Sequence, residues 1–118
     1  MTSLAVYQAE IKRINAAKGW YETERSFGDD IALLHSEVSE AYEAYRQWGT
    51  EDATEQAGRV GFVGNQLPKP EGVGSEFADI LIRLLDSCER HGIDLEKELV
   101  RKITHNRTRA HRHGGKRV

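Results

Sequence analysis

Apolar side chains recur at steps of three and four residues in four separate segments of the chain, which is the period of an amphipathic α-helix. Helices are therefore expected from about residue 3 to 18, from 29 to 49, from 76 to 92 and from 95 onward. The pattern predicts an all-α, four-helix-bundle-like fold. With 118 residues, the chain has room for one domain and one core.

Residues that favour helix ends border these segments. Ser75 and Asp94 are expected to be the N-caps of the third and fourth helices, and the acidic pair at 29–30 suits the start of the second. Glycines, which tolerate the left-handed conformation that often ends a helix, follow the first three segments at Gly19, Gly49 and Gly92.

The second segment has two semi-apolar faces. We expect one face to hold the helix in the bundle, and it carries Ile31, Leu34, Val38, Tyr42 and Tyr45. The other combines Leu33, Ala41 and Ala44 with two carboxylates, Glu37 and Glu40. A charge among apolar neighbours is costly unless something compensates it, so this second face needs an explanation.

The third segment has an apolar arc wider than one helix–helix contact requires. It consists of Phe77, Ile80, Leu81, Ile82, Leu84, Leu85 and Cys88. A monomer of this sequence would leave apolar surface exposed, so we expect the bundle to be completed by self-association, as a homodimer or homotetramer. The fourth segment is expected to bury Leu95, Leu99 and Ile103.

Residues 50–74 separate the second and third helices and contain five glycines and both prolines. We expect a long loop there, because glycine and proline interrupt regular structure. A loop of this length in a compact domain is usually either functional or disordered. The stretch GRVGFVG at 58–64 is compatible with a short strand or a hairpin turn.

Composition excludes several classes of protein. No apolar run approaches the ~18 residues of a membrane span, and the N-terminal stretch MTSLAVYQAEIKR lacks the apolar core of a signal peptide. Cys88 is the single cysteine, so neither an intramolecular disulfide nor a cysteine-rich zinc cage is possible. These features favour a cytoplasmic protein without membrane contact.

Positive charge gathers at the C-terminal end. Residues 101–118 hold seven of the 17 Lys and Arg and none of the 19 Asp and Glu. We expect a helical domain over residues 1–109 and a basic, flexible tail over 110–118. Two interpretations of the basic end remain open: it is a solvated tail, or it binds anions, phosphate in particular.

Two acidic pairs share one spacing. Glu37 and Glu40 are three residues apart, as are Glu76 and Asp79, so each pair lies on one side of its helix. If the helices pack together, four carboxylates surround one site and repel one another unless a cation or protons intervene. Hard oxygen ligands favour Mg²⁺, Mn²⁺ or Ca²⁺. The alternative is a solvated face, with Asp79 paired to Arg83 four residues later.

At these residues the sequence resembles the MazG-like members of the all-α nucleoside triphosphate pyrophosphatases. That family carries Glu-Glu-x-x-Glu on one helix and Glu-x-x-Asp on a later one, and here the segments read SEVSE (36–40) and EFAD (76–79). The resemblance extends from KGW at 18–20 to Arg109 and includes the turn GID and a Lys-x-x-x-Asn. One position departs from this pattern: Ser36 stands in place of the first Glu. Serine is a poor ligand for a hard cation, so we expect one metal ion rather than two or three.

The resemblance implies a MazG fold and Mg²⁺-dependent hydrolysis of (deoxy)nucleoside triphosphates to the monophosphate and pyrophosphate, with Mn²⁺ as a possible substitute. The implied metal ligands are Glu37, Glu40, Glu76 and Asp79. A carboxylate that the metal does not fully engage could accept the proton of the attacking water. We expect Glu40 in that role, with Glu37 as the other catalytic carboxylate.

Substrate-binding residues are expected at both ends of the chain. Lys102 and Asn106 match the family's Lys-x-x-x-Asn, and with Arg109 they form one stripe that would bind the pyrophosphate group; solvated helix residues are the alternative. Trp20 and Trp48 could stack on a base, and Asn15 could hydrogen-bond to it. Packing of the tryptophans and a surface position for the asparagine are the alternatives.

Two other functions remain compatible with the sequence. One is a narrower dUTP or dCTP pyrophosphatase of the same superfamily, in place of a broad nucleotide house-cleaning enzyme. The other is a helical module that binds nucleic acid through the basic residues 101–118. The second is less favoured, because the acidic body offers no continuing basic surface and no recognition-helix motif occurs.

Overall fold

The computed structural model describes residues 3–20, 24–54 and 69–109. This part of the chain contains four α-helices and no strand: α1 (Leu4–Ala17), α2 (Phe27–Trp48), α4 (Val73–Arg90) and α5 (Leu95–Thr108). The all-α prediction is confirmed. The stretch at 58–64 and the tail at 110–118 lie outside the described residues.

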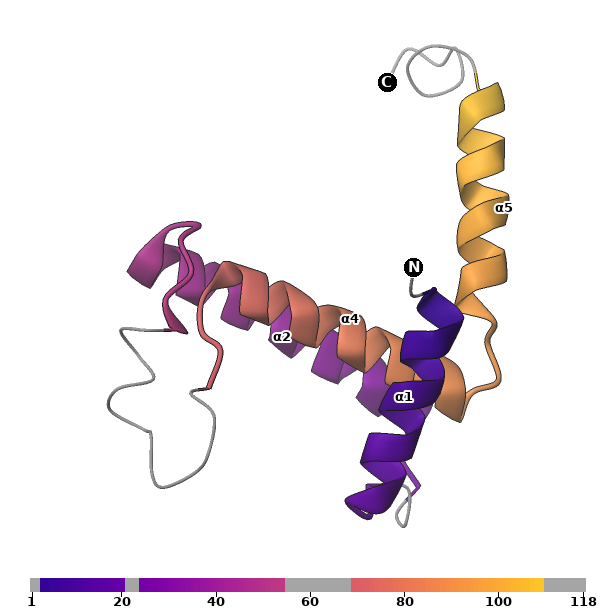
Figure 1. The fold of residues 1–118 in the computed structure, drawn as a ribbon, viewed down its shortest axis with the longest axis horizontal. Helices are drawn as coiled ribbons and strands as arrows, with labels where there is room; N and C mark the ends of the chain where they lie inside the picture. Colours follow the sequence, from indigo (N-terminus) through magenta and orange to yellow (C-terminus); the bar gives the residue numbers. More distant parts are fainter. Residues whose placement is uncertain (1–2, 21–23, 55–68, 110–118) are drawn as a thin grey trace.

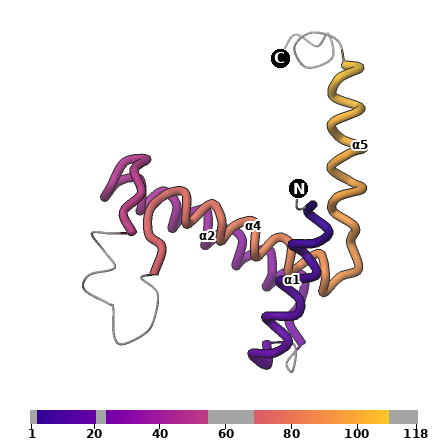
Figure 2. The backbone as a smooth tube through the Cα atoms, in the orientation of Figure 1, coloured from indigo at the N-terminus to yellow at the C-terminus, as the bar shows by residue number. Residues whose placement is uncertain are grey.

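The body of the molecule is an antiparallel pair of helices, α2 and α4, that lie side by side over most of their length (Figure 1). Helix α1 crosses the end of this pair and packs against α4, while α5 contacts α1 and projects away from the body, as the backbone trace in Figure 2 also shows. Four helices are present, but α5 does not lie alongside α2 and α4 as the fourth helix of a closed bundle would.

Side-chain caps define three of the helix starts. Ser3 Oγ accepts from the backbone N–H of Val6 at 3.3 Å, and Ser26 Oγ accepts from that of Asp29 at 3.0 Å, so α2 begins two residues earlier than expected. The predicted cap at Asp94 is confirmed, because its Oδ1 accepts from the backbone N–H of Lys97 at 3.1 Å.

The predicted N-cap at Ser75 is wrong. Helix α4 starts two residues before Ser75, at Val73, and the Ser75 hydroxyl donates instead to the carbonyl oxygen of Pro70 at 3.1 Å. Gly72 precedes the helix with φ at 115°, and a Cβ there would lie 2.9 Å from the carbonyl oxygen of Glu51. The positive φ and the close approach of the 51–53 backbone therefore favour glycine at this position, directly before α4.

The two faces of α2 are used in the opposite way from the one expected. The face that lies against α4 carries the buried residues Asp30, Glu37, Ala41 and Ala44. The apolar stripe faces outward: Val38 is 55% exposed and Tyr42 is 62% exposed. The expectation that this stripe holds α2 in the core is wrong for a single chain, because the alanines allow α4 to approach the other face.

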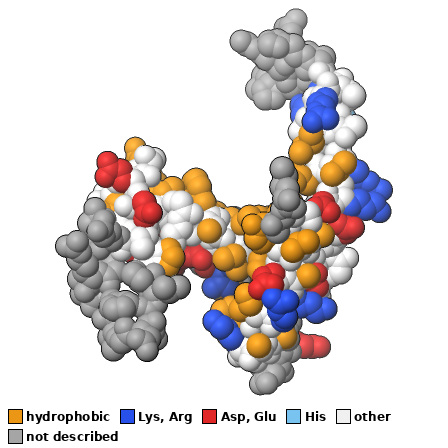
Figure 3. Space-filling view, viewed as in Figure 1, with side chains coloured by type: hydrophobic (Ala, Val, Ile, Leu, Met, Phe, Trp, Pro, Cys, Tyr) orange, Lys and Arg blue, Asp and Glu red, His pale blue; other side chains and the backbone are white. Residues whose placement is uncertain are grey.

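The core within one copy is correspondingly small. Its buried apolar members are Ala41, Ala44, Ala53, Leu85 and Cys88. Large apolar side chains remain exposed on every helix, including Leu99 and Ile103, which were expected to be buried on α5. The hydrophobic surface is visible along the body and on α5 in Figure 3. In the described part of the chain, no helix is long and apolar enough to cross a membrane.

Candidate metal centre

Glu37 lies in the middle of α2, on the face that packs against α4, and is 8% exposed. Its Oε1 accepts from Arg83 Nε of α4 at 2.5 Å. Its Oε2 is buried and has no hydrogen-bond donor among the described residues. An ionised oxygen that is desolvated and left without a donor is costly, and a cation or a proton would remove that cost.

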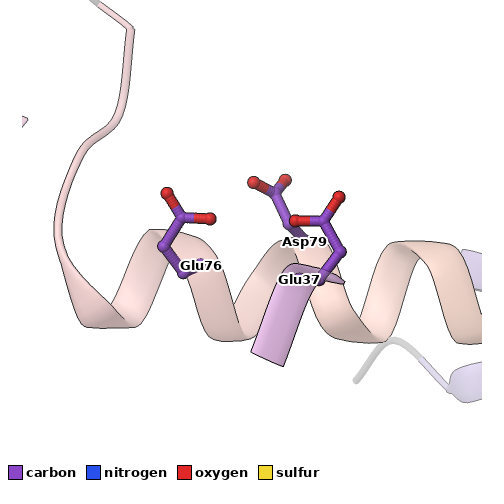
Figure 4. Close-up of side chains that lie close together, drawn as sticks. All are labelled: Glu37, Glu76 and Asp79. Carbon is purple, nitrogen blue, oxygen red and sulfur yellow. The ribbon is translucent and has the colours of Figure 1, made fainter. Parts of the chain in front are cut away.

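Glu76 and Asp79 lie in the first turns of α4, opposite Glu37. One oxygen from each of the three carboxylates lies within 4.8 Å of the others, and Figure 4 shows the three side chains pointing to one side. Glu76 Oε2 is also buried without a hydrogen-bond donor among the described residues. The expected convergence of the two acidic pairs is therefore observed for three of the four carboxylates.

The pKa values of Glu76 and Asp79 are raised, although the positive charge of Lys69 and, for Asp79, that of Arg83 act in the opposite direction. Burial, followed by the charges of Asp79 and Glu37, raises the pKa of Glu76. Burial, followed by the charge of Glu37, likewise raises the pKa of Asp79. Glu71, which the sequence analysis did not single out, adds negative charge to both. In contrast, the hydrogen bond from Arg83 lowers the pKa of Glu37.

The donor set fits a hard divalent cation. It consists of carboxylate oxygens from two packed helices, two of them buried without donors. Such ligands suit Mg²⁺, Mn²⁺ or Ca²⁺ and do not suit the softer metals that prefer thiolate or imidazole. A cation at this position would satisfy the unpartnered oxygens and remove the repulsion that raises the pKa of Glu76 and Asp79.

Glu40, the fourth expected ligand, is exposed on the side of α2 next to this cluster and is not one of the three converging carboxylates. The neighbouring Glu37 carboxylate, with which Glu40 can share a proton and whose like charge acts on it, raises the pKa of Glu40. Glu40 thus lies beside the converging carboxylates, and its expected role as the proton acceptor stays a prediction.

A cavity of about 110 Å³ adjoins the carboxylates. It is lined by Asn15, Trp20, Glu37, Asp79, Ile82, Arg83 and Asp86. Two of the residues expected to bind a base, Asn15 and Trp20, therefore reach the same cavity as two expected metal ligands. Asn15 is buried and its Nδ2 donates to Asp86 Oδ1 at 2.8 Å, whereas Trp20 is 55% exposed.

The remaining candidates are not brought to this cavity within one chain. Trp48 is the last residue of α2, three turns beyond Glu37 and so roughly 16 Å along the helix axis. Lys102 and Asn106 are exposed on α5, which projects away from the α2–α4 pair, and Arg109 follows the last residue of that helix. In a single copy, the expected phosphate-binding group lies apart from the carboxylates.

Arg83 pairs with a different residue from the one that its spacing on α4 suggests. It was considered as a partner of Asp79 four residues earlier, but its side chain bonds to Glu37 on the neighbouring helix. The pattern on α4 shows only that Arg83 lies on the same side as Asp79. Which residue of α2 faces it depends on the register of the two helices, which the sequence pattern does not specify.

A second polar cluster, at the end of the helix pair near α1, was also missed. Buried Asp86 accepts from Arg25 at 2.7 Å and from Arg90 at 3.0 Å, in addition to Asn15. Arg25 also pairs with Asp30, which lies in the first turn of α2 as predicted and is 3% exposed. These contacts join α1, α2, α4 and the segment before α2.

Asp30 is held as an anion in this cluster. Burial alone would raise its pKa, but hydrogen bonds from His91, Arg25 and Ser87 outweigh burial and lower it. His91 Nε2 lies 2.8 Å from Asp30 Oδ2, and the Ser87 hydroxyl donates to the same oxygen at 3.0 Å. Because its donors are all supplied by the protein, this cluster has a structural role rather than that of an open ligand site.

The chain was compared with protein-family models, with curated proteins and with solved structures. None of the three comparisons gave a match.

Proposed function

We propose that Glu37, Glu76 and Asp79 bind Mg²⁺ or Mn²⁺, and that the protein hydrolyses (deoxy)nucleoside triphosphates to the monophosphate and pyrophosphate. One observation carries the proposal: three carboxylates from two helices converge within 4.8 Å, and two of their buried oxygens have no donor among the described residues. The resemblance of SEVSE and EFAD to the MazG-like motifs supplies the reaction class.

The proposed chemistry assigns a separate role to each carboxylate. A bound divalent cation supplies positive charge to the triphosphate and acidifies water. Glu37, Glu76 and Asp79 hold that charge in place. The exposed Glu40 accepts the proton of the attacking water, whose oxygen bonds to the α-phosphorus as the bond to the pyrophosphate group breaks.

The cavity beside the carboxylates gives the proposal a place for the base. Trp20 lines it and is half-exposed, so its ring can stack on a base, while Asn15 marks the inner wall. These residues do not distinguish a broad house-cleaning enzyme from a dUTP or dCTP pyrophosphatase. Rates of pyrophosphate release across the canonical triphosphates would separate the two.

We further propose that the active form is a homodimer or homotetramer. A single copy leaves the α2 stripe and the apolar residues of α5 exposed, and it separates Lys102 and Asn106 from its own carboxylates. Burial of this apolar surface would stabilise an assembly at roughly 25 cal/mol per Å² of area removed from water. A second copy of α5 would then supply the positive charge that the leaving pyrophosphate needs.

The self-association proposal predicts that a charge on the exposed α2 stripe disrupts the assembly. Val38→Lys should shift the protein to a smaller species in sedimentation-velocity experiments, because a lysine would have to be desolvated at the interface. Gln47→Lys is the matched control, since Gln47 lies on the same helix, exposed and away from the stripe. If both variants sediment as the wild type does, the stripe is not the interface.

The metal proposal predicts that stabilisation by a divalent cation depends on pH. The folded pKa values of Glu76 and Asp79 are raised, so the folded protein binds more protons than the unfolded chain between their ordinary and raised pKa values. Without a cation, their contribution to stability therefore falls as pH rises through that window. A cation relieves the repulsion and competes with those protons.

The increase in Tm on adding Mn²⁺ should accordingly be larger at about pH 7.5 than at about pH 5. Each increase is measured against metal-free protein at the same pH, so that other titrating groups cancel. Asp79→Asn should show a smaller increase with a weaker pH dependence. An increase that is equal at the two pH values would contradict the assignment of these carboxylates.

A second candidate function, binding to nucleic acid, is favoured by the exposure of α5, whose residues after Glu98 include no acid. It predicts binding to DNA that weakens steeply with salt and is lost on deletion of 110–118. Hydrolysis, in contrast, should survive that deletion. The two outcomes therefore distinguish the functions in one variant.

A further inference from the structure

Arg83 occupies an unusual position for a residue in a cation site. Its guanidinium carries a permanent positive charge and bonds to Oε1 of Glu37, one of the three converging carboxylates, at 2.5 Å. The site therefore already contains a positive group. An arginine fixed in this position would repel an incoming divalent cation and would occupy one oxygen of the central ligand.

The two partners of this ion pair differ in their freedom to move. The Glu37 side chain is 10% exposed and is held between the helices, whereas the Arg83 side chain is 35% exposed. Arg83 also lines the cavity that adjoins the carboxylates, as Trp20 and Ile82 do. A displaced guanidinium can therefore turn into the cavity or toward water, while Glu37 stays in place for the cation.

The released group would lie where a triphosphate needs it. Arg83 follows Asp79 by one helical turn, and both line the cavity that also reaches Trp20. Phosphates positioned between the base and the cation would pass this side chain. The planar guanidinium donates two parallel hydrogen bonds to phosphate oxygens, a geometry that lysine does not offer.

We propose that Arg83 is the counter-ion of Glu37 in the metal-free protein, that the divalent cation displaces it, and that the displaced guanidinium then binds the phosphates of the substrate. The inference rests on the proposed metal centre and adds a regulation to it: Glu37 stays paired with Arg83 until the cation arrives. Arg83 thus weakens the binding of the cation alone and strengthens the binding of the phosphates.

The two halves of the proposal predict opposite effects in one variant. Arg83→Gln retains a hydrogen-bond donor for Glu37 and removes the charge. In calorimetric titrations with Mn²⁺ alone, this variant should bind the cation roughly tenfold more tightly than the wild type, as expected if the open form is about a tenth of the wild-type population. With saturating Mg²⁺, it should bind inorganic pyrophosphate about tenfold more weakly, because a charge-assisted contact is lost.

Two further variants serve as controls. Arg46→Met removes an exposed arginine that pairs with Glu43 on α2 and should change neither affinity. Arg83→Lys keeps the charge without the planar fork, so its Mn²⁺ affinity should stay near that of the wild type while pyrophosphate binding remains weakened. Far-UV circular dichroism verifies the fold of each variant. If Arg83→Gln is unfolded, Arg83→Met takes its place in the Mn²⁺ titration, with the same roughly tenfold gain expected, and Arg83→Lys tests the binding of pyrophosphate.

The outcomes separate this inference from the proposed function. If the wild type and Arg83→Gln bind Mn²⁺ equally, or the variant binds it more weakly, Arg83 is not a competitor of the cation and the inference is overturned while the metal centre stands. Tighter Mn²⁺ binding with unchanged pyrophosphate binding would overturn the phosphate-binding half. If neither protein binds Mn²⁺, the metal centre itself fails, and with it the proposed function.

Discussion

Replacement of Glu37 by glutamine is expected to reduce pyrophosphate release in the presence of Mg²⁺ by about 10³-fold or more, the scale on which removal of one charged or polar group from a preorganised site acts. Glu37 is the one member of the converging carboxylates that comes from α2, so without its charge the cation is held from α4 alone. The amide is nearly isosteric, so the helix pair should persist. Initial rates with a triphosphate at fixed Mg²⁺ measure the effect.

Glu43→Gln is the matched control for this experiment. Glu43 lies on the same helix, is exposed and pairs with Arg46 at 3.6 Å, so its loss should leave the rate within about twofold of the wild type, as for most surface substitutions. The rise in Tm with Mn²⁺ should also disappear in Glu37→Gln and persist in Glu43→Gln. If folded Glu37→Gln retained the full rate, Glu37 would not be part of the active site.

Of the substitutions proposed here, replacement of Asp86 by alanine should cause the largest loss of stability. We expect the free energy of unfolding to fall by about 3–5 kcal/mol. Asp86 is 4% exposed and accepts from Asn15, Arg25 and Arg90. Without it, buried donors and two positive charges lose their shared partner at the point where α1 meets the α2–α4 pair. Urea-induced unfolding at fixed protein concentration measures the change.

Glu10→Ala is the comparison for this second experiment. Glu10 forms a surface ion pair with Arg13 three residues later on α1, and such pairs contribute little. The urea midpoint of Glu10→Ala should therefore stay near that of the wild type. A loss of less than about 1 kcal/mol in Asp86→Ala would show that water or neighbouring groups replace the carboxylate, and the cluster would not be the main junction of the three helices.

The helices were predictable, but their packing was not. Periodicity located α1, α2, α4 and α5 to within a few residues, because each has a continuous apolar stripe. Periodicity does not say whether a stripe meets another helix of the same chain or is left on the surface. In α2 the stripe with Val38 is outside, and the face with Glu37 and the alanines packs against α4. Ala41 and Ala44 are small, so they allow α4 to approach this face of α2 closely.

The candidate site was predictable where it depends on spacing within one helix. Two carboxylates three residues apart lie on the same side of a helix. Glu76 and Asp79 therefore both face the side chain that α2 presents to them, which is Glu37. The partner of Arg83 depends on the register between α2 and α4, which the sequence pattern does not specify. For the same reason, burial of Asp86 beside two arginines became evident only in the three-dimensional arrangement.

The central claim is a metal-dependent cleavage between the α- and β-phosphates, and the products of the reaction test it most directly. Purified protein is incubated with each common nucleoside and deoxynucleoside triphosphate and Mg²⁺, with and without a chelator, and the products are separated by ion-exchange chromatography. The account predicts equimolar nucleoside monophosphate and pyrophosphate from at least one triphosphate, and no products when the cation is chelated. Release of diphosphate and orthophosphate, or no turnover of any triphosphate by the folded protein, would contradict it.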